Sequence, residues 1–285
     1  MATGIALGGV YALMAVGYSL IFSILNFSNF AYGSIIMLAS YVGYYALKSF
    51  GAPYPIAIMA AMLGAAILSF LNERIAYSSL RKRNAPSLYF MISAMGTSIF
   101  LENIVYATIG ASFKTYPNLF KQMSIDLGGA TIGKLDLFAI IFSIVAISIL
   151  NYFIQYTRTG IAIRAASYDS TVAQINGVNL NFIIGLVFVL AGLLAGISGA
   201  FLGMKYMAYP TMGWITNKAY IAAVIGGLGS LPGAVIGGLL LGVLESFVSV
   251  YIMSTLRDVF SFSILIAFLL FRPSGLFGRY LEEKV

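Results

Sequence analysis

Long apolar runs set the strongest limit on what this chain folds into. Hydrophobic residues make up 60% of the 285 residues and charged residues only 9%, whereas a soluble domain is about 25% charged. One membrane-crossing helix takes about 20 apolar residues. The sequence therefore predicts an all-α, polytopic membrane helix bundle with about eight or nine transmembrane spans and discontinuous segments. The expected spans lie near residues 4–24, 33–50, 55–78, 88–111, 135–156, 181–204, 218–231, 233–254 and 258–271.

Charge and residue usage exclude several classes of function. The formal charge is +7, but the Lys and Arg residues are scattered at the ends of apolar runs, so no nucleic-acid partner is expected. Cysteine and histidine are absent, which removes thiol nucleophiles and His-ligated metals. Residues 128–135 approach a nucleotide-binding loop but lack the Ser or Thr that holds magnesium. We therefore expect no enzyme, no cofactor and one transmembrane domain over residues 1–285.

Basic residues predict the orientation of the chain in the membrane, because Lys and Arg concentrate in cytoplasmic loops. Three such clusters become cytoplasmic together if the short, glycine-rich run at 218–231 spans the membrane. The alternative is that the run at 218–231 is re-entrant and does not span the membrane. The spanning arrangement puts the C-terminus in the cytoplasm, and the N-terminus and the loop at 112–134 outside. The clusters are Arg74 with Arg81, Lys82 and Arg83; Arg158 with Arg164; and Arg272 with Arg279 and Lys284.

A polar, helix-forming segment separates the fifth and sixth apolar runs. Residues 159–177 predict one helix outside the bilayer, and Asn176-Gly177 supplies its C-terminal stop. Small side chains recur at three- and four-residue spacing, which gives a low face suited to another protein's groove. The alternative is a connector lying on lipid headgroups, but the segment lacks the bulky apolar face of such helices. The candidate contacts are Arg164, Ala165, Asp169, Ala173 and Gly177.

Two interruptions of the apolar pattern are candidates for a transport pathway. Residues 26–33 separate the first two runs, and residues 226–233 combine glycines with Pro232 in the other half of the chain. Paired interruptions of this kind indicate a binding site or path through a transporter. Two ordinary tight turns at the membrane face explain them equally well. The candidate path residues are Asn26, Asn29, Gly33, Gly226, Gly227 and Gly229.

Two acidic residues fall inside predicted spans. Glu102 lies in the fourth run and Glu245 near the middle of the eighth. An acid at the centre of a span costs roughly 2.5–3.5 kcal/mol, so each should face the bundle interior. Each is either part of a polar path or an interhelical hydrogen-bonding group. Glu245 joins the candidate path residues.

Five blocks in order resemble the permeases of bacterial ABC importers for branched-chain amino acids. The resemblance extends nearly end to end, with Tyr32 standing where that family more often has His. The family also usually has about a dozen more residues before the first span. The matching blocks are GVYAL with GY and NFAYG at residues 9–33, ERIAY at 73–77, RAASYD with GVN at 164–179, AVIGGLGSLPGA at 223–234 and FRPSGLFGR at 271–279.

The resemblance implies a subunit of an ATP-driven importer in the bacterial cytoplasmic membrane. Its partners would be a second permease, homologous or identical, two ATP-binding cassette subunits and an extracytoplasmic substrate-binding protein. ATP and magnesium would be bound by the ATPases, and residues 159–177 would be the coupling helix. The alternatives are a permease for urea, short amides or sugars on the same scaffold, and a self-contained secondary carrier or channel.

Overall fold

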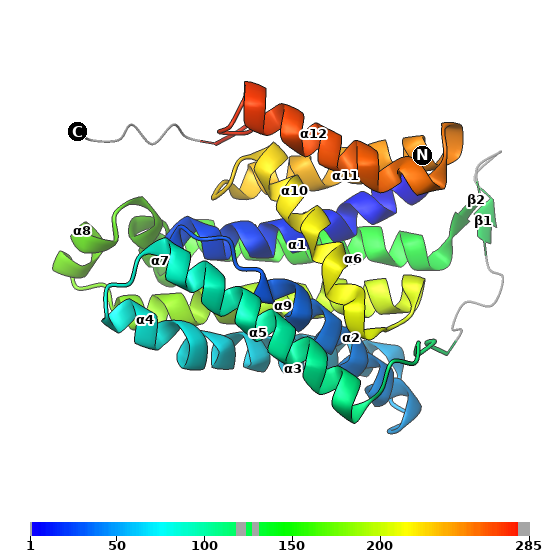
Figure 1. Ribbon diagram of the computed structural model, residues 1–285, viewed down its shortest axis with the longest axis horizontal. Helices are drawn as coiled ribbons and strands as arrows, with labels where there is room; N and C mark the ends of the chain where they lie inside the picture. The colour runs from blue at the N-terminus through cyan, green and yellow to red at the C-terminus, as the bar shows by residue number, and fades with distance from the viewer. Residues whose placement is uncertain (1, 118–123, 127–130, 279–285) are drawn as a thin grey trace.

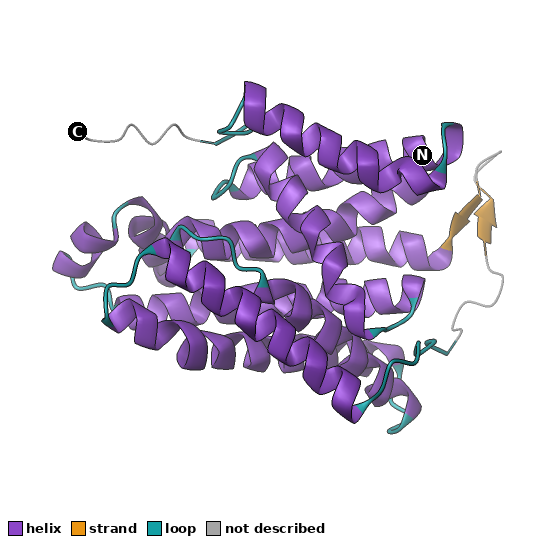
Figure 2. Cartoon of the chain, viewed as in Figure 1, coloured by secondary structure: helices purple, strands orange, loops and turns teal. Residues whose placement is uncertain are grey.

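The computed structural model describes residues 2–117, 124–126 and 131–278. Within these residues the chain is a bundle of helices with one short hairpin (Figure 2). The long helices are α1 (Ala2–Leu25), α2 (Ala31–Lys48), α3 (Tyr54–Asn72), α5 (Ser87–Thr108), α6 (Lys134–Tyr156), α9 (Leu180–Tyr206), α11 (Leu231–Tyr251) and α12 (Arg257–Phe271). The shorter elements are η1 (Glu73–Tyr77), α4 (Ser78–Lys82), α7 (Arg158–Tyr168), α8 (Ser170–Ile175), η2 (Pro210–Ile215), α10 (Thr216–Gly226) and η3 (Ser254–Leu256).

The predicted helical membrane bundle is confirmed, and each predicted apolar run corresponds to a helix. Seven helical segments of the described chain are long and apolar enough to cross a membrane. They do not include α2, which carries four tyrosines and two serines. They also exclude α10, whose 11 residues span only about 16 Å at 1.5 Å per residue. Both α2 and α10 carry the chain back between consecutive spans, and α10 corresponds to the short run at 218–231, for which the sequence left a span and a re-entrant segment open.

The two ends of the bundle are built from different elements (Figure 1). At one end, on the left of the view, lie α4, the α7–α8 segment, the turn after α10 and the end of α12. At the other end lie the start of α1 and the hairpin of β1 (Ser124–Asp126) and β2 (Thr131–Gly133). The basic groups around Arg81, Arg158 and Arg272 thus share one end, which is the arrangement predicted from the positive-inside rule.

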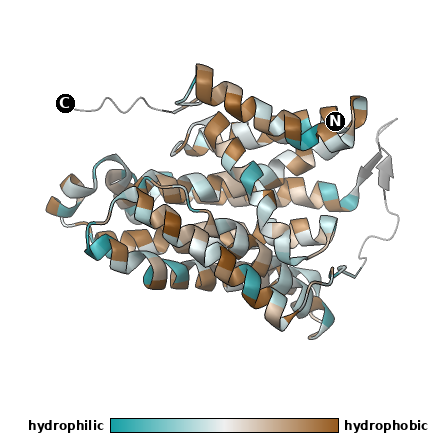
Figure 3. Cartoon of the chain, in the orientation of Figure 1, coloured by the Kyte–Doolittle hydropathy of each residue, from teal (hydrophilic) through white to brown (hydrophobic). Residues whose placement is uncertain are grey.

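Helix α1 forms the centre of the bundle. It packs against α6, α9, α10 and α11, and 89% of its most apolar 18-residue stretch is buried. Glycines let α11 approach it closely: a Cβ on Gly8 would lie 3.0 Å from the Cα of Leu239, a packing device typical of membrane helices. Outer helices instead expose large apolar side chains, as a lipid-facing surface does. Figure 3 shows hydrophobic residues along these helices.

Two local features were not predicted. The loop expected at 112–134 contains β1 and β2, which pair antiparallel with Ser124 opposite Gly133. The end of the third span is η1, a five-residue π-helix between α3 and α4. A π-helix keeps the apolar pattern of an α-helix over so short a length, so periodicity does not reveal it.

Candidate functional site

The polar segment after α6 folds into two helices, so the prediction of a single helix over 159–177 is wrong. Helix α7 begins after Thr157, whose hydroxyl accepts a hydrogen bond from the Gly160 N–H at 3.0 Å. Asp169 then takes an extended conformation (φ −153°, ψ 109°) and breaks the helix. Its Oδ1 accepts from the N–H groups of Thr171 at 2.8 Å and Val172 at 3.0 Å. Asp169 therefore caps α8, a role that short acidic side chains favour over the helix interior.

The predicted C-terminal stop at Asn176-Gly177 is confirmed. Gly177 has φ +84°, and the Val178 N–H bonds to the Ala173 carbonyl at 3.0 Å. This left-handed glycine ends α8 in the manner usual for helix C-termini. Asn179 next caps α9 by accepting from the Phe182 N–H at 3.2 Å. The chain thus returns to the bundle within a few residues of α8.

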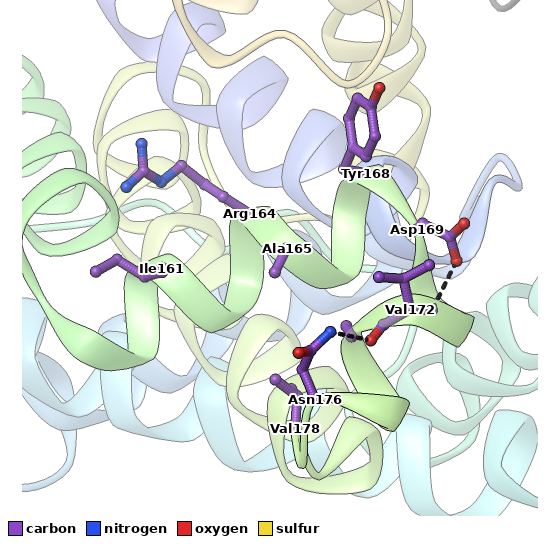
Figure 4. Close-up of a pocket in the computed structure, with 9 residues that line it drawn as sticks. Ile161, Arg164, Ala165, Tyr168, Asp169, Val172, Asn176 and Val178 are labelled. Carbon is purple, nitrogen blue, oxygen red and sulfur yellow. Dashed lines mark hydrogen bonds between the residues drawn. The ribbon is translucent and has the colours of Figure 1, made fainter.

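An open groove of about 460 Å³ lies between α7 and α8. Figure 4 shows the two helices meeting at Asp169, with Arg164 and Tyr168 on α7, Val172 on α8 and Asn176 just after it. The predicted contacts Arg164, Ala165, Asp169 and Ala173 all line it. Gly177 does not line it and serves as the stop.

The exposed side of α7–α8 is bulkier than the sequence pattern predicted. Ala166 and Ala173 are only 3% exposed. Tyr168 is 83% exposed and Ile175 is 80% exposed, and Ile161 and Val172 are also exposed. Two of the small residues are therefore packed inside the protein, and large apolar side chains are exposed beside them. Exposed apolar groups of this kind mark a surface that contacts another protein or the membrane, so the bulky face that the sequence did not predict fits both readings of this segment.

The first interruption, between α1 and α2, is a fixed turn. Asn26 ends α1 in the left-handed conformation (φ +54°) and is exposed. Asn29 is buried, and its Oδ1 accepts from the Tyr77 hydroxyl at 2.7 Å and from the Ala31 N–H at 3.2 Å. A Cβ on Gly33 would lie 2.6 Å from the Gly213 carbonyl oxygen. Because Gly33 has no side chain, η2 can pack closely against α2.

The second interruption, between α10 and α11, is a glycine turn at the end of the bundle that carries α7 and α8. Gly227 (φ +106°) and Gly229 (φ +83°) adopt conformations that other residues rarely take. The Gly226 carbonyl accepts from the Phe277 N–H at 2.9 Å, so the segment after α12 closes on the turn. The Gly229 N–H bonds to the Ser19 hydroxyl of α1 at 3.0 Å. Both interruptions therefore adjoin the last turns of α1.

Glu245 is at the centre of a buried polar cluster that joins four helices. Its carboxylate accepts from the Tyr11 hydroxyl at 2.9 Å and the Ser261 hydroxyl at 2.7 Å, and it pairs with Lys218 at 2.9 Å. Lys218 also pairs with Asp258 at 2.9 Å. The sequence did not reveal Lys218, because it lies 27 residues from Glu245. The only hint in the sequence was that Lys218 lies at the start of the short, glycine-rich run at 218–231.

Removing one contact of this cluster should lower stability measurably. We expect Tyr11→Phe to cost about 1.5–3 kcal/mol, because it deletes a hydrogen bond to a charged group. The control is Tyr251→Phe on α11, whose side chain is 71% exposed. Thermal unfolding of the detergent-solubilised protein checks this expectation, and equal midpoints for the two variants would contradict it.

A separate set of polar contacts, around Glu73 and Arg81, connects the α1–α2 turn with the end of the bundle that carries α7 and α8. Glu73 of η1 is fully buried and pairs with Arg81 at 2.6 Å. Arg81 also donates to Asn181 in the first turn of α9 at 2.9 Å. At the other end of η1, Tyr77 donates to Asn29. The π-helix thus lies between the start of α9 and the α1–α2 turn.

Long apolar helices packed around a buried central span, with a short glycine-flanked helix among them and a helical segment at one end, fit a polytopic membrane protein of the transporter class. Comparison with known proteins agrees. A family model described as branched-chain amino acid transport system / permease component matches residues 1–269. The chain belongs to this family of permeases.

Curated relatives match the chain over its full length. The high-affinity branched-chain amino acid transport system permease protein LivH of Escherichia coli K12 is 38% identical, with 100% of this chain and 96% of the relative covered. BraD of Pseudomonas aeruginosa, with the same description, is 36% identical, with 100% and 97% covered. Among solved structures, PsaBC from Streptococcus pneumoniae in complex with Fab has a TM-score of 0.54 at 14% identity, with 99% and 94% covered. That last likeness concerns the fold alone.

Proposed function

We propose that this chain is the permease subunit of an ATP-driven importer for branched-chain or related amino acids. Full-length similarity to permeases of high-affinity branched-chain amino acid transport systems carries the proposal. The chain would act in the bacterial cytoplasmic membrane with its C-terminus in the cytoplasm. It would form one transmembrane domain over residues 1–285, with an extracytoplasmic binding protein delivering substrate at the opposite end.

The α7–α8 segment would dock an ATPase subunit. The groove between the two helices is open, is bordered by exposed Tyr168 and Ile175, and lies at the end of the bundle with the basic clusters. Arg164, Ala165, Asp169, Ala173 and Gly177 would make or shape the contact. Two such ATPases would bind ATP and magnesium, so this chain would need no cofactor of its own. Movement of the docked ATPase would reach the bundle through α6 and α9, which flank the segment.

The translocation path would run beside the two interruptions that adjoin α1. Asn26, Asn29 and Gly33 would border it on one side, and Gly226, Gly227 and Gly229 on the other. Glu245 would border it near the opposite end, where the short helix α10 begins. The glycine turn after α10 and the asparagine-containing turn after α1 give this region backbone that lies outside regular helices, which membranes tolerate where protein or water surrounds it.

An uptake assay tests the proposal and separates it from the alternatives. The chain is assembled with its ATPases, second permease and binding protein in proteoliposomes, and uptake of labelled leucine is measured. We expect uptake that requires internal ATP, survives ionophores that collapse ion gradients, and is competed by isoleucine and valine. Competition by urea, acetamide or ribose instead would assign another substrate. Uptake that follows an ion gradient without ATP would identify a secondary carrier and overturn the proposal.

A further inference from the structure

The π-helix η1 is connected to the end of the bundle that carries α7 and α8. At its start, the fully buried Glu73 pairs with Arg81, and Arg81 donates to Asn181 in the first turn of α9 at 2.9 Å. Helix α9 in turn contacts both α7 and α8. A movement of the α7–α8 segment against the bundle therefore has a short route, through the start of α9, to η1.

The other end of η1 holds the α1–α2 turn through one side chain, Tyr77. This tyrosine is 0% exposed, and its hydroxyl donates to Oδ1 of Asn29 at 2.7 Å. The hydroxyl oxygen accepts from Nδ2 of Asn72 at 3.3 Å, which leaves its hydrogen for Asn29. The ring of Tyr77 also packs on Phe27 of the same turn, with 5.2 Å between the ring centroids. Tyr77 therefore holds the turn by a hydrogen bond and by ring packing.

The backbone of η1 has a wider hydrogen-bond pattern than an α-helix. The Ser78 N–H bonds to the carbonyl of Glu73, five residues earlier, whereas in an α-helix that carbonyl would accept from Tyr77. A change from one pattern to the other would turn the residues that follow by about 100° around the helix axis. Short π-helices occur frequently at functional sites. A change of pattern in η1 would move Tyr77 relative to Asn29.

The α1–α2 turn supplies one side of an aromatic contact with α10. Phe30 directly follows Asn29, and its ring centroid lies 6.3 Å from that of Tyr220 on α10. Tyr220 also lies 5.7 Å from Tyr18 of α1. Tyr18 is buried, whereas Phe30 and Tyr220 are partly exposed. This contact joins the first interruption of the apolar pattern to the helix that leads into the second, so a movement of the turn would change it.

We propose that Tyr77 and Asn29 are positioning residues through which η1 transmits movement of the α7–α8 segment to the α1–α2 turn and to the contact between Phe30 and Tyr220. This inference rests on the proposed function, in which an ATPase moves α7–α8. Ring packing on Phe27 alone would suffice to fill the space around η1. Transmission requires the hydroxyl as well, because the hydrogen bond fixes the direction in which Tyr77 holds the turn.

Tyr77→Phe tests this role because it keeps the ring and removes only the hydroxyl. The assembled transporter is reconstituted in proteoliposomes, and leucine uptake and ATP hydrolysis are measured on the same preparation. We expect ATP hydrolysis close to that of the unsubstituted transporter and about fivefold or less of the leucine imported per ATP, a loss at the low end of couplings between distant sites. The result that would overturn the inference is an unchanged ratio of leucine to ATP.

Tyr116→Phe is the matched control. Tyr116 is also a buried tyrosine, and it donates to the backbone carbonyl of Ser40 away from η1. This variant should keep the normal ratio of leucine to ATP. An equal fall of the ratio in both variants would refute a specific role for Tyr77. A parallel fall of hydrolysis, uptake and thermal unfolding midpoint in Tyr77→Phe would show a structural role only, and would also overturn the inference.

Asn29→Ala, alone and combined with Tyr77→Phe, tests whether the two residues act through one contact. Because both substitutions remove the same hydrogen bond, the double variant should lose no more of the ratio than the more affected single variant. Losses that multiply would show that the two residues act separately, against the inference. ATP-dependent leucine uptake by the unsubstituted transporter is measured alongside, and its absence would refute the proposed function itself. Normal uptake with unaffected variants would refute the inference alone.

Discussion

Ala165→Trp should reduce ATP-dependent uptake by more than about tenfold while the permease still folds. Ala165 is exposed and lines the groove between α7 and α8. An indole at this position would fill the space that the proposed ATPase contact needs. Disruption at the centre of a protein interface commonly costs about 2 kcal/mol or more, which corresponds to roughly 30-fold weaker docking. Substrate-stimulated ATP hydrolysis and uptake should therefore fall together.

Ser167→Trp is the matched control for this expectation. Ser167 is also a small, exposed residue of α7, but it does not line the groove. The Ser167→Trp variant should retain most uptake. Both variants should show the size-exclusion profile and thermal stability of the unsubstituted permease. Co-purification of the ATPase with each variant measures docking directly. Full uptake by Ala165→Trp, or equal losses in both variants, would refute the assignment of the groove.

The sequence predicted the spans well because each is a long apolar run with little charge. Even the weak run at 218–231 was recognised as unusual, and α10 is indeed too short to cross a bilayer alone. The split between α7 and α8 was missed although its signal was present. Asp169 precedes Ser170 and Thr171, a pattern typical of a helix start, but its charge was interpreted as a contact for a partner.

The polar contacts of the bundle could not be predicted from sequence. Glu245 was recognised as a buried acid, but its pairing with Lys218, Tyr11 and Ser261 depends on how four helices pack. The burial of Glu73 could not be predicted, because this residue lies at the end of an apolar run, where an acid normally faces water. The fold instead buries it completely and brings Arg81 to it. Contacts between distant segments follow from packing, and periodicity within one helix carries no information about them.

Arg81→Ala should destabilise the permease by roughly 3–5 kcal/mol, the usual cost of stranding a buried charge. The Glu73 side chain is 0% exposed and its Oε1 lies 2.6 Å from Nη1 of Arg81. Arg74 compensates little, because its Nε is 3.6 Å from the carboxylate and its side chain is 46% exposed. The substitution also deletes the hydrogen bond to Asn181 at the start of α9. Thermal unfolding in detergent measures the loss.

Two further variants separate charge burial from a general effect of losing an arginine. Arg83→Ala removes an exposed charge two residues away and should change stability by no more than about 0.5 kcal/mol. Glu73→Gln combined with Arg81→Ala removes the stranded charge and should recover part of the loss. If Arg81→Ala and Arg83→Ala unfold at the same temperature, the ion pair does not hold η1 in place. The η1 helix connects α9, through Arg81, to the α1–α2 turn, through the hydrogen bond from Tyr77 to Asn29. If the double variant is stable but transports poorly, the contact between Arg81 and α9 is needed for transport and not only for stability.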